Sequence, residues 1–116
     1  MLRLKSEMWV KAYLRRCAVA GVDAVLVRRG DADAGAIYIK VSRLDGTAAL
    51  FGPAPAGMDE TREERRWQAC LDREPAPEGE ADAYLERQVA FDPDVWIIAV
   101  DDQQGRHFLE DWLAAT

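Results

Sequence analysis

The chain has 116 residues, of which 49% are hydrophobic and 31% charged, and its formal net charge is −6. This length and balance fit one globular domain over residues 1–116 and exclude a disordered chain. No apolar run reaches the roughly 18 residues that a membrane-spanning helix needs, and no signal-peptide stretch follows Met1–Lys5. We therefore expect a small acidic cytoplasmic protein that does not enter a membrane.

Charge is distributed unevenly along the chain. Residues 1–43 carry nine Lys/Arg and four Asp/Glu, a net +5, whereas residues 44–116 carry six and seventeen, a net −11. This distribution argues against nucleic-acid binding by the whole surface, although a basic face opposite an acidic one is allowed. Cys17 and Cys70 lack the spacing of a metal knuckle or a redox pair, so we expect two reduced, mostly buried thiols.

Apolar periodicity predicts an α+β fold with the element order α-β-β-β-β-α-β-α and a mainly antiparallel sheet of about five strands. The first predicted helix spans Ser6–Ala20 and ends at Gly21. Its apolar stripe consists of Trp9, Ala12, Tyr13, Cys17 and Ala20. The other predicted elements are strands at 24–28, 36–43, 47–50, 67–71 and 95–100 and helices at 81–91 and 108–113. The first two helices are expected to cover the sheet.

The sequence also predicts the register of one hairpin and the position of one strand in the sheet. Asp45 and Gly46 favour a two-residue type I′ hairpin, which would pair Leu44 with Thr47 and Val41 with Leu50. Val95–Val100 is continuously apolar, which is typical of a central strand covered on both faces. We therefore place this strand in the middle of the sheet.

Three stretches together resemble a known family. They are RLKSEMWVKAYLRR at 3–16, VRRGDADAGAIYIKVSRLDG at 27–46 and FDPDVWIIAVDDQQGRHFL at 91–109, with ERRW at 64–67 between them. The sequence is similar over nearly its whole length to the alphaproteobacterial family called domain of unknown function 1491 (DUF1491). The resemblance implies no activity, cofactor or site residue, so candidate residues must be judged on their chemistry.

The densest polar group is the segment between the first two predicted strands, where Arg28 and Arg29 are followed by Asp31 and Asp33. Two carboxylates two residues apart, with Lys40 nearby, could bind a hard cation. A calcium loop needs more oxygen ligands than this segment supplies, and Asp side chains often stabilise turns instead. We expect a solvated turn, no metal and no cofactor, and keep a metal site as the alternative.

The element order also resembles the core of the PD-(D/E)xK nuclease superfamily. That resemblance implies metal-binding roles for Glu7, for Asp31 or Asp33, and for Lys40. Tyr38 stands where this motif needs an acid two residues before the lysine, so the metal shell would lack a carboxylate.

Several other residues could bind a ligand or take part in catalysis. Three arginine pairs, at 15–16, 28–29 and 65–66, could contact phosphates, although nearby acids can neutralise most of them. His107 could activate Cys70, but neither residue lies in a nucleophile motif, and a capping or surface role suits this histidine better. Trp112, near the C-terminus, is the best candidate for an exposed contact residue.

These observations favour a non-catalytic binding or assembly module, with Arg28, Arg29, Asp31, Asp33, Lys40 and Trp112 as candidate binding residues. A metal-dependent hydrolase or nuclease that uses Asp31, Asp33 and Lys40 is the alternative. We also predict a homodimer to which the helix at 108–113 contributes its apolar stripe. The same stripe could instead pack against the sheet of its own chain.

Overall fold

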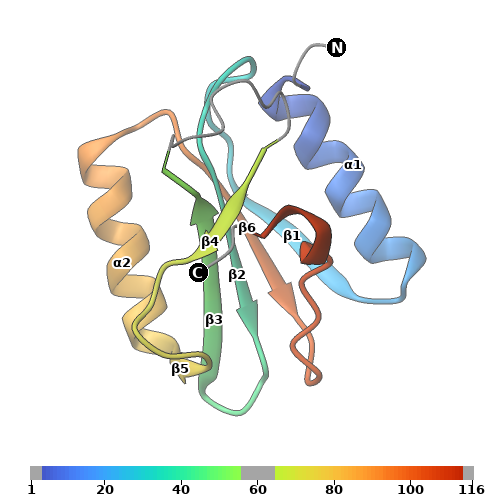
Figure 1. Ribbon diagram of the computed structural model, residues 1–116, viewed down its shortest axis with the longest axis vertical. Coiled ribbons are helices and arrows are strands. Elements are labelled where there is room, and N and C mark those ends of the chain that lie inside the picture. Colours follow the sequence, from blue (N-terminus) through green and yellow to red (C-terminus); the bar gives the residue numbers. More distant parts are fainter. Residues whose placement is uncertain (1–3, 56–64, 114–116) are drawn as a thin grey trace.

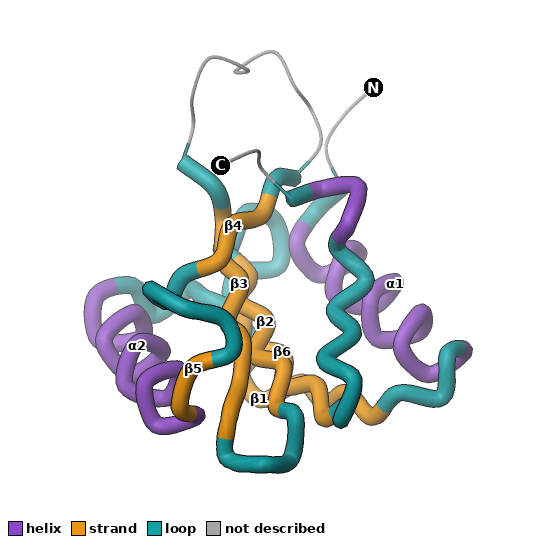
Figure 2. The backbone as a smooth tube through the Cα atoms, turned by 60° about the horizontal axis from the view of Figure 1, so that its bottom comes forward, coloured by secondary structure: helices purple, strands orange, loops and turns teal. Residues whose placement is uncertain are grey.

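A computed structural model describes residues 4–55 and 65–113 of the protein. These residues form α1 (Ser6–Val19), β1 (Asp23–Arg28), β2 (Ile37–Ser42), β3 (Thr47–Pro53), β4 (Trp67–Ala69), β5 (Ala76–Pro77), α2 (Glu78–Phe91), β6 (Trp96–Asp101) and the 3₁₀ turn η1 (Glu110–Trp112). The strands form one sheet in the order β1-β6-β2-β3-β4, with β5 paired to β3 (Figure 2). Only the β2–β6 pair among these strands is parallel. The predicted α+β class, element order and mainly antiparallel sheet are confirmed.

One helix packs on each face of the sheet (Figure 1). The strict alternation of β2 sends Ile37, Ile39 and Val41 into the core under α1, and Tyr38 into the core under α2. Strand β6 lies between β1 and β2 and contributes apolar side chains to both cores, so its predicted central position is confirmed. Within the described residues, no helix is long and apolar enough to cross a membrane.

The buried stripe of α1 differs in part from the predicted one. Val10, Tyr13 and Cys17 are buried at helical spacing, whereas Ala12 and Ala20 are exposed. The helix ends at Val19, and Gly21 follows with a φ of +74°, the left-handed conformation that favours glycine. Helix α2 begins at Glu78, three residues before the predicted start, and ends at Phe91 as expected before Pro93.

The predicted register of the β2–β3 hairpin is wrong by one residue. Val41 pairs with Ala49 rather than Leu50, and the Arg43 N–H donates to the Thr47 carbonyl, which leaves a three-residue connection. The side-chain period of a strand is two, so this shift decides which face of β3 meets which core. In the observed register Leu50 lies in the core under α2.

The C-terminal segment forms a shorter helix than predicted. Residues 108–113 contain only η1, because Phe108 adopts a φ of +60° that an α-helix does not allow. Leu109 is fully buried, while Phe108, Trp112 and Leu113 pack against the core under α1. The apolar stripe therefore completes the core of its own chain, which was the second of the two predicted outcomes.

Candidate functional site

The segment between β1 and β2 caps helix α1. The residue before the helix, Lys5, makes no side-chain capping bond. Instead, the Asp33 carbonyl accepts a hydrogen bond from the Ser6 N–H (3.2 Å), and the Ala32 carbonyl accepts one from the Glu7 N–H (2.9 Å). The first N–H groups of a helix have no partner within the helix, and this segment supplies two of them with acceptors.

The two acidic side chains of this segment do not converge on a common point. One Asp31 oxygen accepts the backbone N–H groups of Asp33 (3.2 Å) and Ala34 (2.9 Å), which is a turn-stabilising arrangement. The Asp33 carboxylate lies 3.6 Å from the Lys5 ammonium at the exposed surface. No cluster of three or more His, Cys, Asp or Glu suited to a metal ion occurs in the described part of the chain.

Lys40 is held on the α2 side of the sheet, away from this segment. Its Nζ lies 2.7 Å from an Asp82 oxygen and 2.8 Å from a Glu78 oxygen, both on α2. Burial alone would lower the pKa of Lys40, but these two hydrogen-bonded carboxylates raise it above its ordinary value. The structure therefore does not bring Lys40 together with Asp31 and Asp33.

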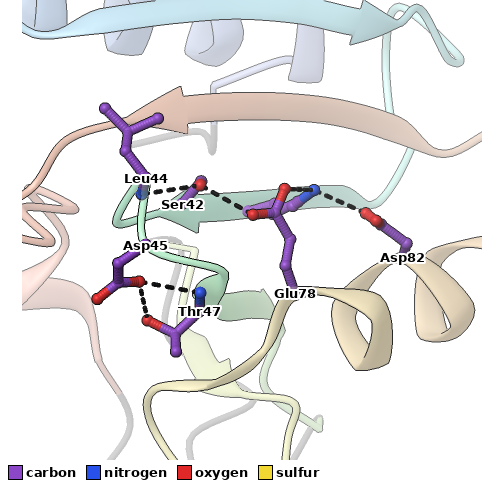
Figure 3. A network of polar contacts seen from close by, with 7 residues as sticks. Ser42, Leu44, Asp45, Thr47, Glu78 and Asp82 are labelled. Atoms are coloured by element: carbon purple, nitrogen blue, oxygen red, sulfur yellow. Dashed lines mark hydrogen bonds and ion pairs between the residues drawn. The ribbon is translucent and has the colours of Figure 1, made fainter.

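The same polar network joins α2 to the hairpin (Figure 3). Ser42 donates to Glu78 (3.0 Å) and accepts the Leu44 N–H (3.2 Å). In the turn, an Asp45 oxygen accepts both the N–H and the hydroxyl of Thr47. These bonds connect β2 to the turn and to the start of α2, so the described groups of this network serve as one another's partners.

Arg28 and Arg29 are used within the fold. The Arg28 guanidinium donates to the Pro93 carbonyl (2.9 Å). Arg29 forms an ion pair with Glu7, and its guanidinium lies 5.2 Å from the centre of the Trp96 ring. The Trp96 indole donates in turn to the Asp31 carbonyl (2.7 Å). Glu7, the acid offered for a nuclease site, thus has a structural partner.

A buried hydroxyl that the sequence pattern did not single out connects three segments. Ser6 is fully buried, donates to the Gly35 carbonyl (2.6 Å) and accepts from the Arg65 guanidinium (2.9 Å). Arg65 also donates to the Leu4 carbonyl (3.1 Å). A serine at the start of a helix suggests a cap, but no sequence signal indicates its long-range arginine partner.

His107 and the cysteines do not form a nucleophilic pair. The Nδ1 of His107 accepts the Leu109 N–H (3.0 Å), and a Glu110 carboxylate oxygen lies 3.5 Å from the same nitrogen. The ring lies against Phe51 in the core under α1, whereas Cys70 packs against the core under α2. Burial raises the pKa values of both Cys17 and Cys70, which disfavours reactive thiolates.

A pocket with aromatic and arginine side chains in its lining lies between α1 and the C-terminal segment. This pocket of about 470 Å³, here called the α1 pocket, is lined by Leu4, Trp9, Ala12, Tyr13, Arg15, Arg16, Val19 and Trp112. The hydroxyl of buried Tyr13 donates to the His107 carbonyl (2.7 Å), and burial raises its pKa well above the ordinary range. The pocket therefore combines an aromatic wall with a neutral phenol and two guanidinium groups.

The two arginines of the α1 pocket have no carboxylate partner among the described residues. Arg16 lies over the Phe108 ring at 5.4 Å from its centre, and Arg15 makes no ion pair with any residue of 4–55 or 65–113. Arg106, in contrast, is held by Asp102, and Arg73 by Glu80. Of the candidate binding residues, only Trp112 lies in this pocket.

These contacts define a small α+β protein with an arginine-rimmed apolar pocket and no assembled catalytic group in the part that the structure describes. Residues 4–110 match the model of the family described as "Protein of unknown function (DUF1491)". The chain therefore belongs to the DUF1491 family, as the three sequence stretches predicted. Comparison with curated proteins finds no match.

Solved structures of similar proteins have the same fold. A crystal structure of a DUF1491 family protein from Caulobacter crescentus CB15 has a TM-score of 0.78 at 39% identity, and the match covers 99% of this chain and 100% of that one. An NMR structure of a DUF1491 family protein from the same organism gives 0.81 at 38% identity with the same coverage. The solution structure of protein Atu0922 from A. tumefaciens gives 0.74 at 38% identity over 86% of each chain.

Proposed function

We propose that the protein is a non-catalytic binding and assembly module of the cytoplasm whose contact site is the α1 pocket. One observation carries the proposal: in the α1 pocket, aromatic side chains lie beside two guanidinium groups that have no carboxylate partner among the described residues. The volume of the pocket falls in the range of about 300–1,000 Å³ that is usual for ligand sites. Cys17 and Cys70 are both free, which suits a reducing compartment.

The chemistry of the α1 pocket selects for an apolar group that carries a negative charge. Trp9 and Trp112, which are partly exposed, offer apolar area at low conformational cost, and aromatic and arginine side chains are enriched at binding hot spots. Arg15 and Arg16 would pair with carboxylates next to the apolar anchor. We therefore propose that the partner is a protein segment with an aromatic or aliphatic anchor between acidic residues.

A peptide titration tests this proposal. The probe is acetyl-Glu-Leu-Phe-Glu-amide, compared with the same peptide carrying Gln in place of Glu, and binding is followed by ¹⁵N–¹H NMR shifts of the full chain. We expect shifts at α1 and Trp112, with the acidic peptide bound about fivefold more tightly, since two exposed ion pairs contribute roughly 1 kcal/mol in total.

Two variants locate the binding. Arg15→Glu should abolish the preference for the acidic peptide, whereas Lys11→Glu, the same charge change on the same helix outside the pocket, should leave binding within about twofold. Equal binding of both peptides by the wild type, or shifts that do not involve the pocket, would show that the α1 pocket is not the site.

We also propose that the module forms a homodimer. The basis differs from the predicted one, because Leu109 is buried and Trp112 and Leu113 are partly buried against the core of their own chain. Exposed apolar side chains occur instead on β1, where Val25, Leu26 and Val27 are 60%, 39% and 59% exposed. Sedimentation equilibrium at micromolar concentration should give twice the monomer mass of 13.0 kDa.

A further inference from the structure

Strand β1 is an edge strand with an unusual exposed surface. It pairs only with β6 among the described strands, so its outer N–H and C=O groups are free of a ladder partner there. Its three central residues, Val25, Leu26 and Val27, are exposed on an element that carries neither lysine nor proline. Such an edge promotes pairing with another chain, and proteins usually protect it with charges, prolines or a covering segment.

The opposite edge of the sheet has this protection. Strand β4 is only three residues long, and Trp67 in it forms a bridge with Leu113 of the C-terminal segment. In β1 the protective devices are the charged Asp23 and Arg28 at its two ends and a bulge between Leu26 and Arg28, which leaves Asp23 to Leu26 in regular register with β6 and the apolar centre uncovered. The difference between the two edges indicates that β1 is the one available to another chain.

The charges of β1 specify which chain that is. The strand begins with Asp23, continues through four apolar residues and ends with Arg28, followed by Arg29. When two copies pair antiparallel, Asp23 of each copy approaches Arg28 and Arg29 of the other, and the apolar centres face one another. The contacts of these arginines with the Pro93 carbonyl and with Glu7 lie at the exposed surface, where a guanidinium can accept a second anionic neighbour. Parallel pairing would instead bring like charges together. The pattern is therefore complementary to itself in the antiparallel sense alone.

An apolar groove beside β1 favours the same arrangement. The groove, about 510 Å³ in volume, lies on the α2 face of the sheet, where Val27, Ile97 and Ala99 meet Leu85 and Val89. The charged residues Lys40, Asp82 and Glu86 complete its lining. Helix α2 packs on β2, β3 and β5, so it covers the part of this face that is far from the β1 edge (Figure 1). Pairing two β1 strands around a twofold axis would place the two grooves side by side and surround Val27 with apolar neighbours.

We propose that two copies of this chain join through antiparallel pairing of their β1 strands into one continuous sheet. This inference rests on the proposed homodimer but not on the α1 pocket. Asp23 suits a test, because its exposed carboxylate forms no ion pair within the described part of the chain. Asp23→Lys should therefore leave the fold intact while it places a lysine opposite the partner's arginines.

Sedimentation equilibrium of the full chain measures the effect. We expect Asp23→Lys to raise the dimer dissociation constant at least about tenfold, since the charge conflict occurs twice in a symmetric dimer. Asp72→Lys, which makes the same charge change in the exposed loop after β4, should leave the constant unchanged. A stable dimer that is insensitive to Asp23→Lys would overturn the β1 interface, and a wild-type chain that remains monomeric would overturn the homodimer itself.

Cysteine cross-linking gives a second, positional readout. The Cα atoms of residues opposite each other in an antiparallel pair of strands lie about 4.5–5.5 Å apart, a separation that permits a disulfide between two cysteines. Val25→Cys should form a covalent dimer under mild oxidation that reductant reverses, whereas Val19→Cys, at an exposed position on α1, should not. Equal cross-linking of the two variants would contradict the assignment, because β1 would then be no closer to its copy than α1.

Discussion

The two hydrogen bonds of the Ser6 hydroxyl, here called the Ser6 joint, are expected to contribute strongly to the free energy of unfolding. This buried hydroxyl donates to the Gly35 carbonyl and accepts from Arg65, so it links α1, the capping segment and the chain leading to β4. Ser6→Ala removes both bonds and leaves the carbonyl without this donor. A neutral hydrogen bond contributes about 0.5–1.5 kcal/mol and one to a charged group about 1.5–3 kcal/mol.

The better helix propensity of alanine offsets roughly 0.5 kcal/mol of this loss. The net expected destabilisation of Ser6→Ala is therefore about 1.5–4 kcal/mol. With an unfolding entropy of about 2.1 cal/mol/K per residue, 116 residues convert this into a melting temperature lower by about 6–16 °C. Circular dichroism melts and urea titrations of the two chains measure both quantities.

A double-mutant cycle separates the bond from other effects of Arg65. Ser6→Ala and Arg65→Met, alone and together, should give a coupling energy of about 1–2 kcal/mol. Ser42→Ala offers a comparison, because this buried hydroxyl also makes two hydrogen bonds, but its charged partner Glu78 is about one-third exposed to solvent, so the loss should be smaller, about 1–2 kcal/mol. A fall in melting temperature below about 2 °C for Ser6→Ala would refute this account of the joint.

Three further predictions concern the loops. Gly35→Ala should destabilise the fold strongly, because the added Cβ would lie 2.4 Å from the Asp94 carbonyl oxygen. Gly79→Ala, at an open position in α2, should instead stabilise the fold by about 0.5–1 kcal/mol in urea titrations. Equal effects of the two substitutions would contradict the packing around Gly35. Hydrogen bonds from Arg106 lower the pKa of Asp102, so its contribution is present above the unfolded pKa of about 3.9 and is lost as pH falls through the lower folded pKa. Asp102→Asn should therefore show a shallower loss of stability in urea titrations between pH 5 and pH 3 than the wild type, and unchanged pH dependence would contradict this. Isothermal titration with Mg²⁺ should give the same result for the wild type and for Asp33→Ala, because Asp33 is not expected to bind the metal. Mg²⁺ binding by the wild type that is lost in Asp33→Ala would support the hydrolase alternative.

The fold could be predicted from the sequence where one-dimensional periodicity decides it. The alternation through Ile37, Ile39 and Val41 gave a strand with two distinct faces, and the apolar run at 95–100 gave the central strand. Both signals depend only on the spacing of side chains along one element. The hairpin register could not be predicted in this way, because Asp45–Gly46 suits both a two-residue and a longer connection.

The C-terminal segment shows a second limit of periodicity. Phe108, Leu109, Trp112 and Leu113 have helical spacing, but the segment obtains its stability by docking on the core under α1. Its backbone is stabilised by contacts from distant elements, as where Tyr13 donates to the His107 carbonyl. Such tertiary contacts override local propensity, and no pattern within the segment encodes them.

The candidate site was harder to predict because charged residues stabilise loops as often as they bind ligands. Asp31 and Asp33 attracted a metal hypothesis by their spacing, yet the carboxylate of Asp31 and the carbonyl of Asp33 serve as hydrogen-bond acceptors for backbone groups. Lys40 lies near them in sequence but pairs with acids on α2, a partner choice that follows from the alternation of β2. Sequence proximity therefore grouped residues that the sheet separates.

The best candidates for contact with a partner are charged side chains that lie next to apolar surface and form no ion pair within the described chain. Arg15 meets this condition beside the aromatic wall of the α1 pocket, and Asp23 meets it beside the apolar centre of β1. A charge in such a position gives direction and selectivity to an apolar contact that would otherwise be nonspecific. In the proposed assembly an acidic segment would bind the first site and the arginine end of another β1 the second. Dimerisation through the sheet edge would then leave the α1 pocket available.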